Sequence, residues 1–231
     1  MKRIAIIQSN YIPWKGYFDI INSVDEFVIY DNAQYTRRDW RNRNIIKTKD
    51  GLKWLTIPVE VKGKYNQKIM ETRIADKKWA LKHWKMIKYN YCPSLVFREY
   101  EGLFEETYLQ SEKLNFLSDV NRLFISVINS ILGIKTLITD SSKYKMEGNR
   151  NEKIISICKQ ANAGLYLTGP SAKTYIDEKM FFESGINLIW VDYKGYPEYN
   201  QIFPPFEHAV SIIDVIFNNG VKSTSFLKSF Q

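Results

Sequence analysis

Short runs of apolar or β-branched residues alternate with segments of helical periodicity along most of this chain. Such runs, bounded by polar or turn-forming residues, are typical of β-strands. An Asp-Gly pair at Asp50-Gly51 is typical of a hairpin turn between two of them. The strands that this pattern predicts are Arg3–Ile7, Glu26–Tyr30, Asn44–Thr48, Leu52–Val59, Ile69–Ile74, Thr136–Thr139, Leu165–Thr168 and Asn187–Val191.

Apolar residues at helical spacing predict the other elements. Asn149 and Glu152 have the spacing of a helix N-terminal capping box, and Gly185 and Gly220 supply C-terminal stops. The predicted helices are Gly16–Ser23, Asn149–Ala163, Asp177–Ser184 and Val210–Asn218, with a longer helical stretch from Asp76 to about Leu132 that Pro93 interrupts.

Short apolar strands that are separated by helices indicate an α/β fold with a mainly parallel, open sheet and flanking helices. We expect a β-hairpin after the second strand and a helical insertion at about residues 76–132. The chain has no internal repeat and no linker-like segment, so residues 1–231 are predicted to form a single α/β domain with this insertion.

Composition adds a preference for anionic ligands. The 231 residues carry a net charge of +8, and aromatic residues make up 15% of the chain. Cys92 and Cys158 form no disulfide pattern, which favours a reducing compartment. The N-terminal apolar run is too short for a signal peptide, and no stretch has the length of a membrane helix, so we expect a cytoplasmic protein.

The first stretch with candidate chemistry is QSNYIPWKGYFDII, Gln8 to Ile21, between the first strand and the first helix. Ligands of open α/β sheets gather at the carboxyl ends of strands, where this loop is expected. Gly16 would permit close approach of a ligand, and Lys15 would add a positive charge. The alternative is an ordinary strand-to-helix turn in which Pro13 and Trp14 only pack.

The second stretch is YDNAQYTRRDWRNRN, Tyr30 to Asn44, which follows the second strand. Asp31 is expected at the same sheet edge, and Trp40 sits among planar groups suited to phosphate oxygens and sugar hydroxyls. Most runs of charge are solvated faces, but the interleaved asparagines and Trp40 favour the wall of a pocket. The planar groups are Gln34, Arg41, Asn42, Arg43 and Asn44, of which the two arginines would share a face on an extended chain.

The third stretch is DKKWALKHWKMIKYNY, Asp76 to Tyr91, with a predicted apolar helix stripe. His83 lies at the border of this stripe, where a histidine can point into a cleft and act near neutral pH. The commoner outcome is a packed histidine with one satisfied nitrogen, and the residues alone favour it.

The fourth stretch is LYLTGPSAKTYIDEKMF, Leu165 to Phe181, in which a strand runs into a glycine turn. Backbone amides after Gly169 could hold an anion, and Ser171 could cap the following turn or contact the ligand. The alternative is an ordinary β–α turn that uses turn-favouring residues.

Several kinds of site have no signal in the sequence. His83 and His208 are far apart and have no partners at metal-ligand spacing, so we predict no metal site. The chain also has no nucleophile elbow, Walker A loop or dinucleotide fingerprint, and no cofactor can be named.

Taken in order, these motifs resemble the WbqC-like family. The resemblance rests on IQSNYIPWKGYFDII, DNAQYTRRDWRNRN, WLTIPV, the tryptophan-and-histidine helix, YLTGPSAKTYI and SIIDVIFNNG, and it runs from about Ile4 to Gly220. Members are small bacterial proteins encoded with surface-polysaccharide (O-antigen) genes and are commonly regarded as transferases, some described as glycine or acyl transferases acting on amino sugars. The residues that match these motifs are Gln8, Tyr11, Lys15, Gly16, Asp31, Gln34, Arg41, Asn42, Asn44, His83, Gly169, Ser171, Tyr175 and Asp214.

The resemblance implies a cytoplasmic transferase that moves an acyl or aminoacyl group onto the amine of a nucleotide-linked amino sugar. His83 or Asp31 would accept the amine proton, and Lys15, Arg41 and Arg43 would hold phosphate oxygens. Gln34, Asn42 and Asn44 would contact sugar hydroxyls. The acyl donor, the role of Asp214 and the oligomeric state stay open.

Three alternatives remain. One is a sugar-nucleotide or glycan-binding protein without catalysis. Another is ATP-dependent amide formation, by analogy with nucleotidylyltransferase-like enzymes, although Trp14 and Tyr17 stand where those enzymes carry histidines. The third, nucleic-acid binding, is disfavoured because the middle helices are acidic and no RNA-binding signature occurs.

Overall fold

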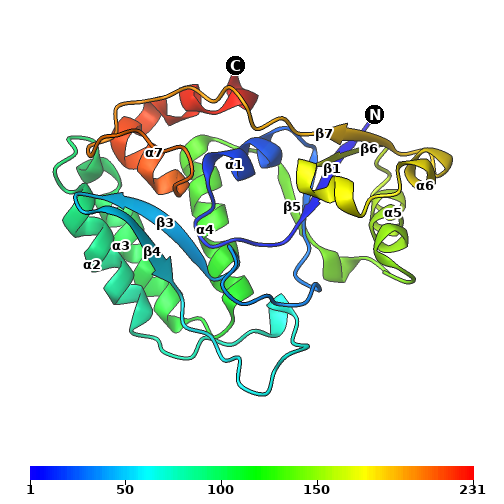
Figure 1. Cartoon of the computed structure of the whole chain (residues 1–231), viewed down its shortest axis with the longest axis horizontal. Helices are drawn as coiled ribbons and strands as arrows, with labels where there is room; N and C mark the ends of the chain where they lie inside the picture. Colours follow the sequence, from blue (N-terminus) through cyan, green and yellow to red (C-terminus); the bar gives the residue numbers. More distant parts are fainter.

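The computed structural model describes all residues, 1–231, and its centre is a five-stranded parallel sheet (Figure 1). The strands are β1 (Arg3–Ile7), β2 (Glu26–Ile29), β5 (Leu137–Asp140), β6 (Leu165–Thr168) and β7 (Asn187–Trp190). They lie side by side in the order β5-β2-β1-β6-β7. The predicted α/β fold with a mainly parallel sheet is therefore confirmed.

The order of the strands creates a switch point beside β1. After β1 the chain moves to β2 and then β5 on one side, and it returns to β6 on the other side. The connections on either side of β1 run in opposite directions, which leaves a crevice at the carboxyl ends of β1 and β6.

The chain has seven α-helices. They are α1 (Lys15–Asn22), α2 (Trp79–Tyr91), α3 (Phe97–Lys113), α4 (Leu117–Leu132), α5 (Arg150–Gln160), α6 (Glu178–Glu183) and α7 (Ile212–Asn219). Helices α2 to α4 occupy most of the predicted helical insertion. The assignment of the whole chain to one domain stays a prediction.

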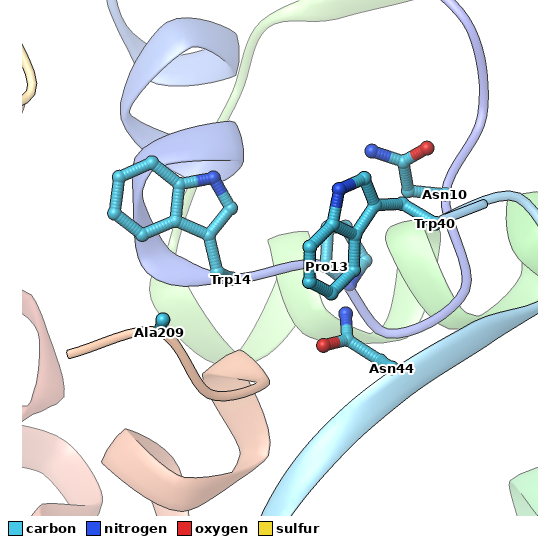
Figure 2. Close-up of a pocket in the computed structure, with 6 residues that line it drawn as sticks. All are labelled: Asn10, Pro13, Trp14, Trp40, Asn44 and Ala209. Atoms are coloured by element: carbon cyan, nitrogen blue, oxygen red, sulfur yellow. The ribbon is translucent and has the colours of Figure 1, made fainter. Parts of the chain in front are cut away.

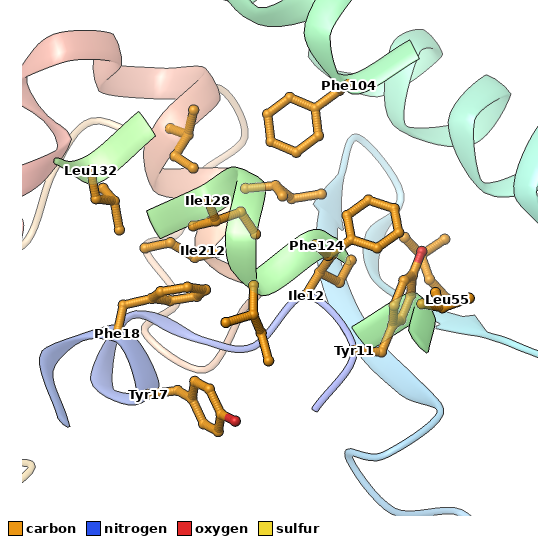
Figure 3. Close-up of a cluster of buried hydrophobic side chains, with 14 of the residues drawn as sticks. Tyr11, Ile12, Tyr17, Phe18, Leu55, Phe104, Phe124, Ile128, Leu132 and Ile212 are labelled. Atoms are coloured by element: carbon orange, nitrogen blue, oxygen red, sulfur yellow. The ribbon is translucent and has the colours of Figure 1, made fainter. Parts of the chain in front are cut away.

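Successive residues of the strands pack into two separate hydrophobic cores. Ala5 and Phe27 belong to the larger core, which also takes side chains from α1, α4 and α7 (Figure 3). Ile4 and Val28 face the other way, into a smaller core with α5. Because side chains alternate along a strand, both faces of the central strands are buried, which explains why β1, β2 and β6 consist mainly of apolar residues.

The antiparallel hairpin of β3 (Arg43–Thr48) and β4 (Gly51–Thr56) is separate from the parallel sheet. Ile46 and Leu55 place it in the larger core, and the Ser211 amide donates to the Ile45 carbonyl at 2.8 Å. The predicted hairpin after the second strand is confirmed, with Gly51 at φ +96° in the turn.

One predicted strand is wrong. Ile69–Ile74 contains a short 3₁₀ helix, Ile69–Glu71, followed by two isolated bridges. The Glu71 carboxylate accepts a hydrogen bond from the Lys68 amide at 2.9 Å and closes the turn. The two buried isoleucines therefore reach the core from an irregular segment, and the intervening Met70 is exposed.

No helix of the chain has both the length and the hydropathy needed to cross a membrane.

Candidate functional site

A cavity of about 430 Å³ lies at the carboxyl edge of the parallel sheet, at the switch point between β1 and β6. We call it the sheet-edge cavity. Its walls come from the ends of β1, β2 and β6, from the start of α5 and from the segment after β7. The residues that line it are Ile6, Ile7, Gln8, Tyr30, Ala33, Arg41, Arg150, Ile154, Tyr166, Thr168, Gly169, Ser171, Ala172, Tyr175 and Tyr193.

Two arginines and no carboxylate line this cavity. Arg41 is held by Asn10, whose Oδ1 accepts from its guanidinium, and by Asp39 at 3.7 Å. The buried Nε of Arg41 has no hydrogen-bond partner in the protein. The guanidinium groups of the two arginines are charged donors that suit an anionic ligand in the cavity.

Four tyrosines line the cavity beside the arginines: Tyr30, Tyr166, Tyr175 and Tyr193. Burial raises the pKa of each. They therefore stay protonated near neutral pH and can donate hydrogen bonds to ligand oxygens. The guanidinium of Arg150 lies 4.4 Å from the ring centre of Tyr175, which fixes both side chains in the wall.

Gly169 leaves room for one of these tyrosines. A Cβ at this position would lie 3.0 Å from the hydroxyl oxygen of Tyr193. The glycine thus lets the segment after β7 close over the end of β6, a reason for glycine here that differs from the predicted anion cradle.

Five of the predicted site residues meet at the sheet-edge cavity: Gln8, Arg41, Gly169, Ser171 and Tyr175. Sequence reasoning missed Tyr30, Arg150 and Tyr193. Tyr30 directly follows β2 and Arg150 begins α5, so both lie at element ends that could have marked them. Tyr193 lies in a segment without periodicity, and no sequence signal indicates it.

Asp31 lies at the same edge of the sheet, but its carboxylate already accepts hydrogen bonds from within the protein. Its two carboxylate oxygens accept hydrogen bonds from the amide and hydroxyl of Ser9 at 2.9 and 2.7 Å. Burial raises its pKa, and the Ser9 bonds oppose that shift. Asp31 therefore holds the loop that carries Gln8.

His83 and Tyr11 form a buried network away from the sheet-edge cavity. The Tyr11 hydroxyl lies 3.0 Å from Nδ1 of His83 and 2.8 Å from the Tyr108 hydroxyl. Burial lowers the pKa of His83 to about 4, while a hydrogen bond with the Thr56 backbone opposes the shift. The imidazole is neutral at physiological pH and bonded within the core.

Lys15 and Gly16 also lie outside the cavity. The Lys15 side chain is buried among aromatic rings, its Nζ donates to the Pro197 carbonyl at 3.1 Å, and burial lowers its pKa to about 8. A Cβ on Gly16 would lie 2.3 Å from the Trp14 ring, so this glycine accommodates an indole and not a ligand.

The other planar side chains of the second stretch, Tyr30 to Asn44, do not meet at one site. Asn42 donates to the Ile57 carbonyl at 2.8 Å, and Asn44 donates to the carbonyls of Tyr11 and Ile12 at 3.0 and 2.9 Å. Gln34 donates to the Tyr65 carbonyl at 2.9 Å in a separate surface hollow.

The two arginines predicted to share a face do not line the same cavity. Arg43 stacks on the Trp54 ring at 4.1 Å, whereas Arg41 precedes β3 and lines the sheet-edge cavity. The chain turns at Arg41–Asn42, so the extended alternation begins only at Arg43.

Asp214 is a buried anchor for the C-terminal region. It accepts hydrogen bonds from the hydroxyls of Tyr91 and Tyr199 at 2.6 and 2.7 Å and from Gln201 at 2.8 Å. These bonds join α2 and α7 to the segment that precedes α7. No group of three or more His, Cys, Asp and Glu side chains is arranged to hold a metal ion.

Comparisons with known proteins identify the family. No solved structure matches the chain. A protein of Mycobacterium tuberculosis named "Uncharacterized protein Rv1507c" is 47% identical over 228 residues, which cover 99% of this chain and 98% of the relative. The sequence profile of the WbqC-like protein family matches residues 8–226. The chain therefore belongs to the WbqC-like protein family.

Proposed function

We propose that the sheet-edge cavity binds the phosphate-bearing part of a nucleotide-linked amino sugar, a precursor of bacterial surface polysaccharide such as O-antigen. The observation that carries this proposal is that two arginines, Arg41 and Arg150, and no carboxylate line the cavity. Arg150 lines the same cavity and supplies a second positive charge. Guanidinium groups suit phosphate oxygens, and the crevice at a switch point is where open α/β sheets bind ligands.

The rest of the wall suits the uncharged parts of such a ligand. Tyr30, Tyr175 and Tyr193 offer rings for flat groups and hydroxyls for sugar oxygens, and Gln8 and Ser171 add polar contacts at the strand ends. A volume of about 430 Å³ lies within the range of small-molecule sites, roughly 300–1,000 Å³.

The reaction that we propose is transfer of an acyl or aminoacyl group to the amine of this sugar. The amine lone pair would attack the acyl carbonyl carbon, the amine would lose a proton, and the donor's leaving group would depart with the electron pair of the broken bond. ATP-dependent activation of a carboxylate would supply the same acyl group.

A second candidate, binding without catalysis, is favoured by one specific observation. Asp31, His83 and Lys15, the residues suggested for proton transfer and charge stabilisation, are all buried and bonded within the protein, and none lines the sheet-edge cavity. We assign these three side chains to positioning the surrounding loops.

Ligand binding is tested by thermal shift with UDP- and dTDP-linked amino sugars, their non-amino counterparts, ATP, coenzyme A and a short single-stranded RNA. A ligand at a hundredfold its Kd adds about 2.7 kcal/mol, which raises Tm by roughly 5–10 °C for a chain of this size. Arg41→Ala should abolish the shift, whereas Arg98→Ala, an exposed arginine on α3, should leave it unchanged. A shift with RNA alone would overturn the proposal, and so would the absence of a shift with every nucleotide sugar.

Catalysis is tested separately, by mass spectrometry of the best-binding amino sugar after incubation with acyl-coenzyme A or with ATP and a carboxylic acid. An acylated product that requires the protein supports the transferase. Binding without product, under every donor, supports the second candidate.

A further inference from the structure

A second cavity, of about 260 Å³, lies on the other side of the Gln8–Pro13 loop region, and two indole rings flank it (Figure 2). We call it the Trp14–Trp40 pocket. Figure 2 shows the two rings on opposite sides of the pocket in that view, with Asn10 and Asn44 near Trp40. The residues that line it are Asn10, Pro13, Trp14, Trp40, Asn44 and Ala209.

The Trp40 wall is exposed but held in place. The side chain is 42% exposed, although indole is a large apolar group that normally favours burial. Its ring lies 5.4 Å from the ring of Trp54, on which the guanidinium of Arg43 stacks at 4.1 Å. Its carbonyl accepts from the Tyr11 amide at 3.0 Å. Trp40 and Trp54 together form a fixed, exposed apolar surface, which a ligand with an apolar face can contact.

The Trp14 wall is fixed from its own side. The ring packs edge-on against Tyr193 and Tyr196, at 5.1 and 5.6 Å between centres. It also lies directly against Gly16, where no side chain could be accommodated without moving it. Both walls are therefore pre-organised, and a ring that enters the pocket meets apolar surface without reordering the protein.

The polar groups of the pocket are mostly donors. The indole N–H groups of Trp14 and Trp40 and the amide nitrogen of Asn10 make no hydrogen bond within the protein. The amide of Asn44 is engaged, since its oxygen accepts from the Ile45 amide at 2.8 Å and its nitrogen donates to two carbonyls. No charged side chain lines the pocket.

We infer that the Trp14–Trp40 pocket binds a sugar ring. A pyranose offers an apolar C–H face to an indole and carries oxygen acceptors around its rim, which matches apolar walls with free donors. A volume of about 260 Å³ falls just below the range of drug-sized ligands, roughly 300–1,000 Å³, and suits a single ring. This inference concerns the ring alone and does not require a nucleotide.

A hydrogen bond nevertheless links a wall of this pocket to a wall of the sheet-edge cavity. Arg41 lines that cavity, and its guanidinium donates to Oδ1 of Asn10, which lines the pocket. The sugar ring could come from two sources that share this chemistry: the sugar of a nucleotide sugar that reaches past Arg41, or a separate glycan.

The test is saturation-transfer NMR with methyl glycosides of N-acetylglucosamine, glucose and galactose, each added alone. We expect transfer from the protein to the ring protons of at least one glycoside, reduced at least fivefold in Trp40→Ala and partly retained in Trp40→Phe. Phe182→Ala, which removes an exposed aromatic ring from α6, should leave the signal unchanged. Absence of transfer in the wild-type protein, or equal transfer in Trp40→Ala, would each overturn the inference.

The source of the ring is distinguished with UDP-N-acetylglucosamine and UDP in Arg41→Ala. Sugar-ring transfer that this variant loses for UDP-N-acetylglucosamine, but keeps for the methyl glycoside, assigns the ring to a nucleotide sugar. Methyl glycoside transfer, with no transfer to UDP in the wild-type protein and no effect of Arg41→Ala on UDP-N-acetylglucosamine, assigns it to a separate glycan. In the second case the proposed nucleotide site fails while the sugar-ring site stands.

Discussion

Both carboxylate oxygens of Asp31 accept hydrogen bonds from Ser9, one from the amide at 2.9 Å and one from the hydroxyl at 2.7 Å. Asn121 on α4 donates to the same hydroxyl at 3.0 Å. Asp31, just after β2, thus holds the loop after β1, and Asn121 on α4 holds the same loop. Since Gln8 and Asn10 flank Ser9, this one carboxylate positions a residue of each cavity.

Asp31→Ala should destabilise the protein by about 3 kcal/mol, because it removes two charge-assisted bonds and leaves the buried Ser9 amide unpaired. Asp31→Asn, which keeps one acceptor, should lose less. Urea unfolding at pH 7 measures both. Asp50→Ala, at the exposed hairpin turn, is the matched control, and equal losses in Asp31→Ala and Asp50→Ala would contradict the anchoring role.

His83 makes stability dependent on acid pH. Its folded-state pKa of about 4 lies below the ordinary value of 6.5, so below pH 6.5 the unfolded chain binds a proton that the folded core excludes. Stability should therefore fall as the pH is lowered from 6.5 to 4, by on the order of 3 kcal/mol from this group. Urea unfolding between pH 4 and 7 should show a smaller loss in His83→Gln than in the wild type. His208→Gln, at an exposed histidine whose pKa is lowered by partial burial and by Lys15, should reduce the loss by less than His83→Gln does.

The predicted strand boundaries were most accurate for the strands that are buried at the centre of the sheet. Arg3–Ile7 and Leu165–Thr168 match β1 and β6 to the residue, because both are apolar runs between polar neighbours at the centre of the sheet. Ile69–Ile74 also places isoleucines at both of its ends but lies outside the sheet, where tertiary contacts of single residues replace strand pairing. A local pattern cannot distinguish these cases.

The site prediction had a similar limit. The rule that ligands gather at strand ends found Gln8, Gly169 and Ser171. It also selected Asp31, because a polar side chain at a strand end can either face a ligand or hold a neighbouring loop. Only the positions of the partners separate these roles, and those partners lie far away in the chain.

Gly16→Ala should disturb the Trp14–Trp40 pocket directly, and the sheet-edge cavity only through the contact of Trp14 with Tyr193. Alanine favours a helix over glycine by about 1 kcal/mol, so α1 itself would gain. The new Cβ would meet the Trp14 ring at 2.3 Å and push it from its place. We expect a changed tryptophan fluorescence spectrum, weaker methyl glycoside binding and a Tm at or below that of the wild type. Gly102→Ala, where a Cβ meets open space on α3, should be neutral or stabilising, and the same response in Gly16→Ala would show that the Trp14 contact is irrelevant.

Lys15 is a buried cation that has aromatic neighbours in place of an ion pair. Its Nζ lies 5.0, 5.5 and 5.8 Å from the ring centres of Tyr196, Tyr199 and Phe206. Burial lowers its pKa to about 8 from 10.5, although Asp19, Asp214 and Glu198 oppose the shift. Between these two values the unfolded chain holds a proton that the folded chain has lost, so stability from this group rises as the pH rises.

Lys15→Met keeps the length of the side chain and removes its titration. Relative to this variant, the wild-type protein should gain about 2 kcal/mol of unfolding free energy between pH 7.5 and 9.5. Urea unfolding across this range measures the difference, and tyrosine titration cancels because both proteins carry the same tyrosines. Lys85→Met, at an exposed position on α2, should run parallel to the wild type. If the Lys15→Met curve is parallel as well, the lysine is solvated in the folded protein, and the aromatic cluster around it is open to water.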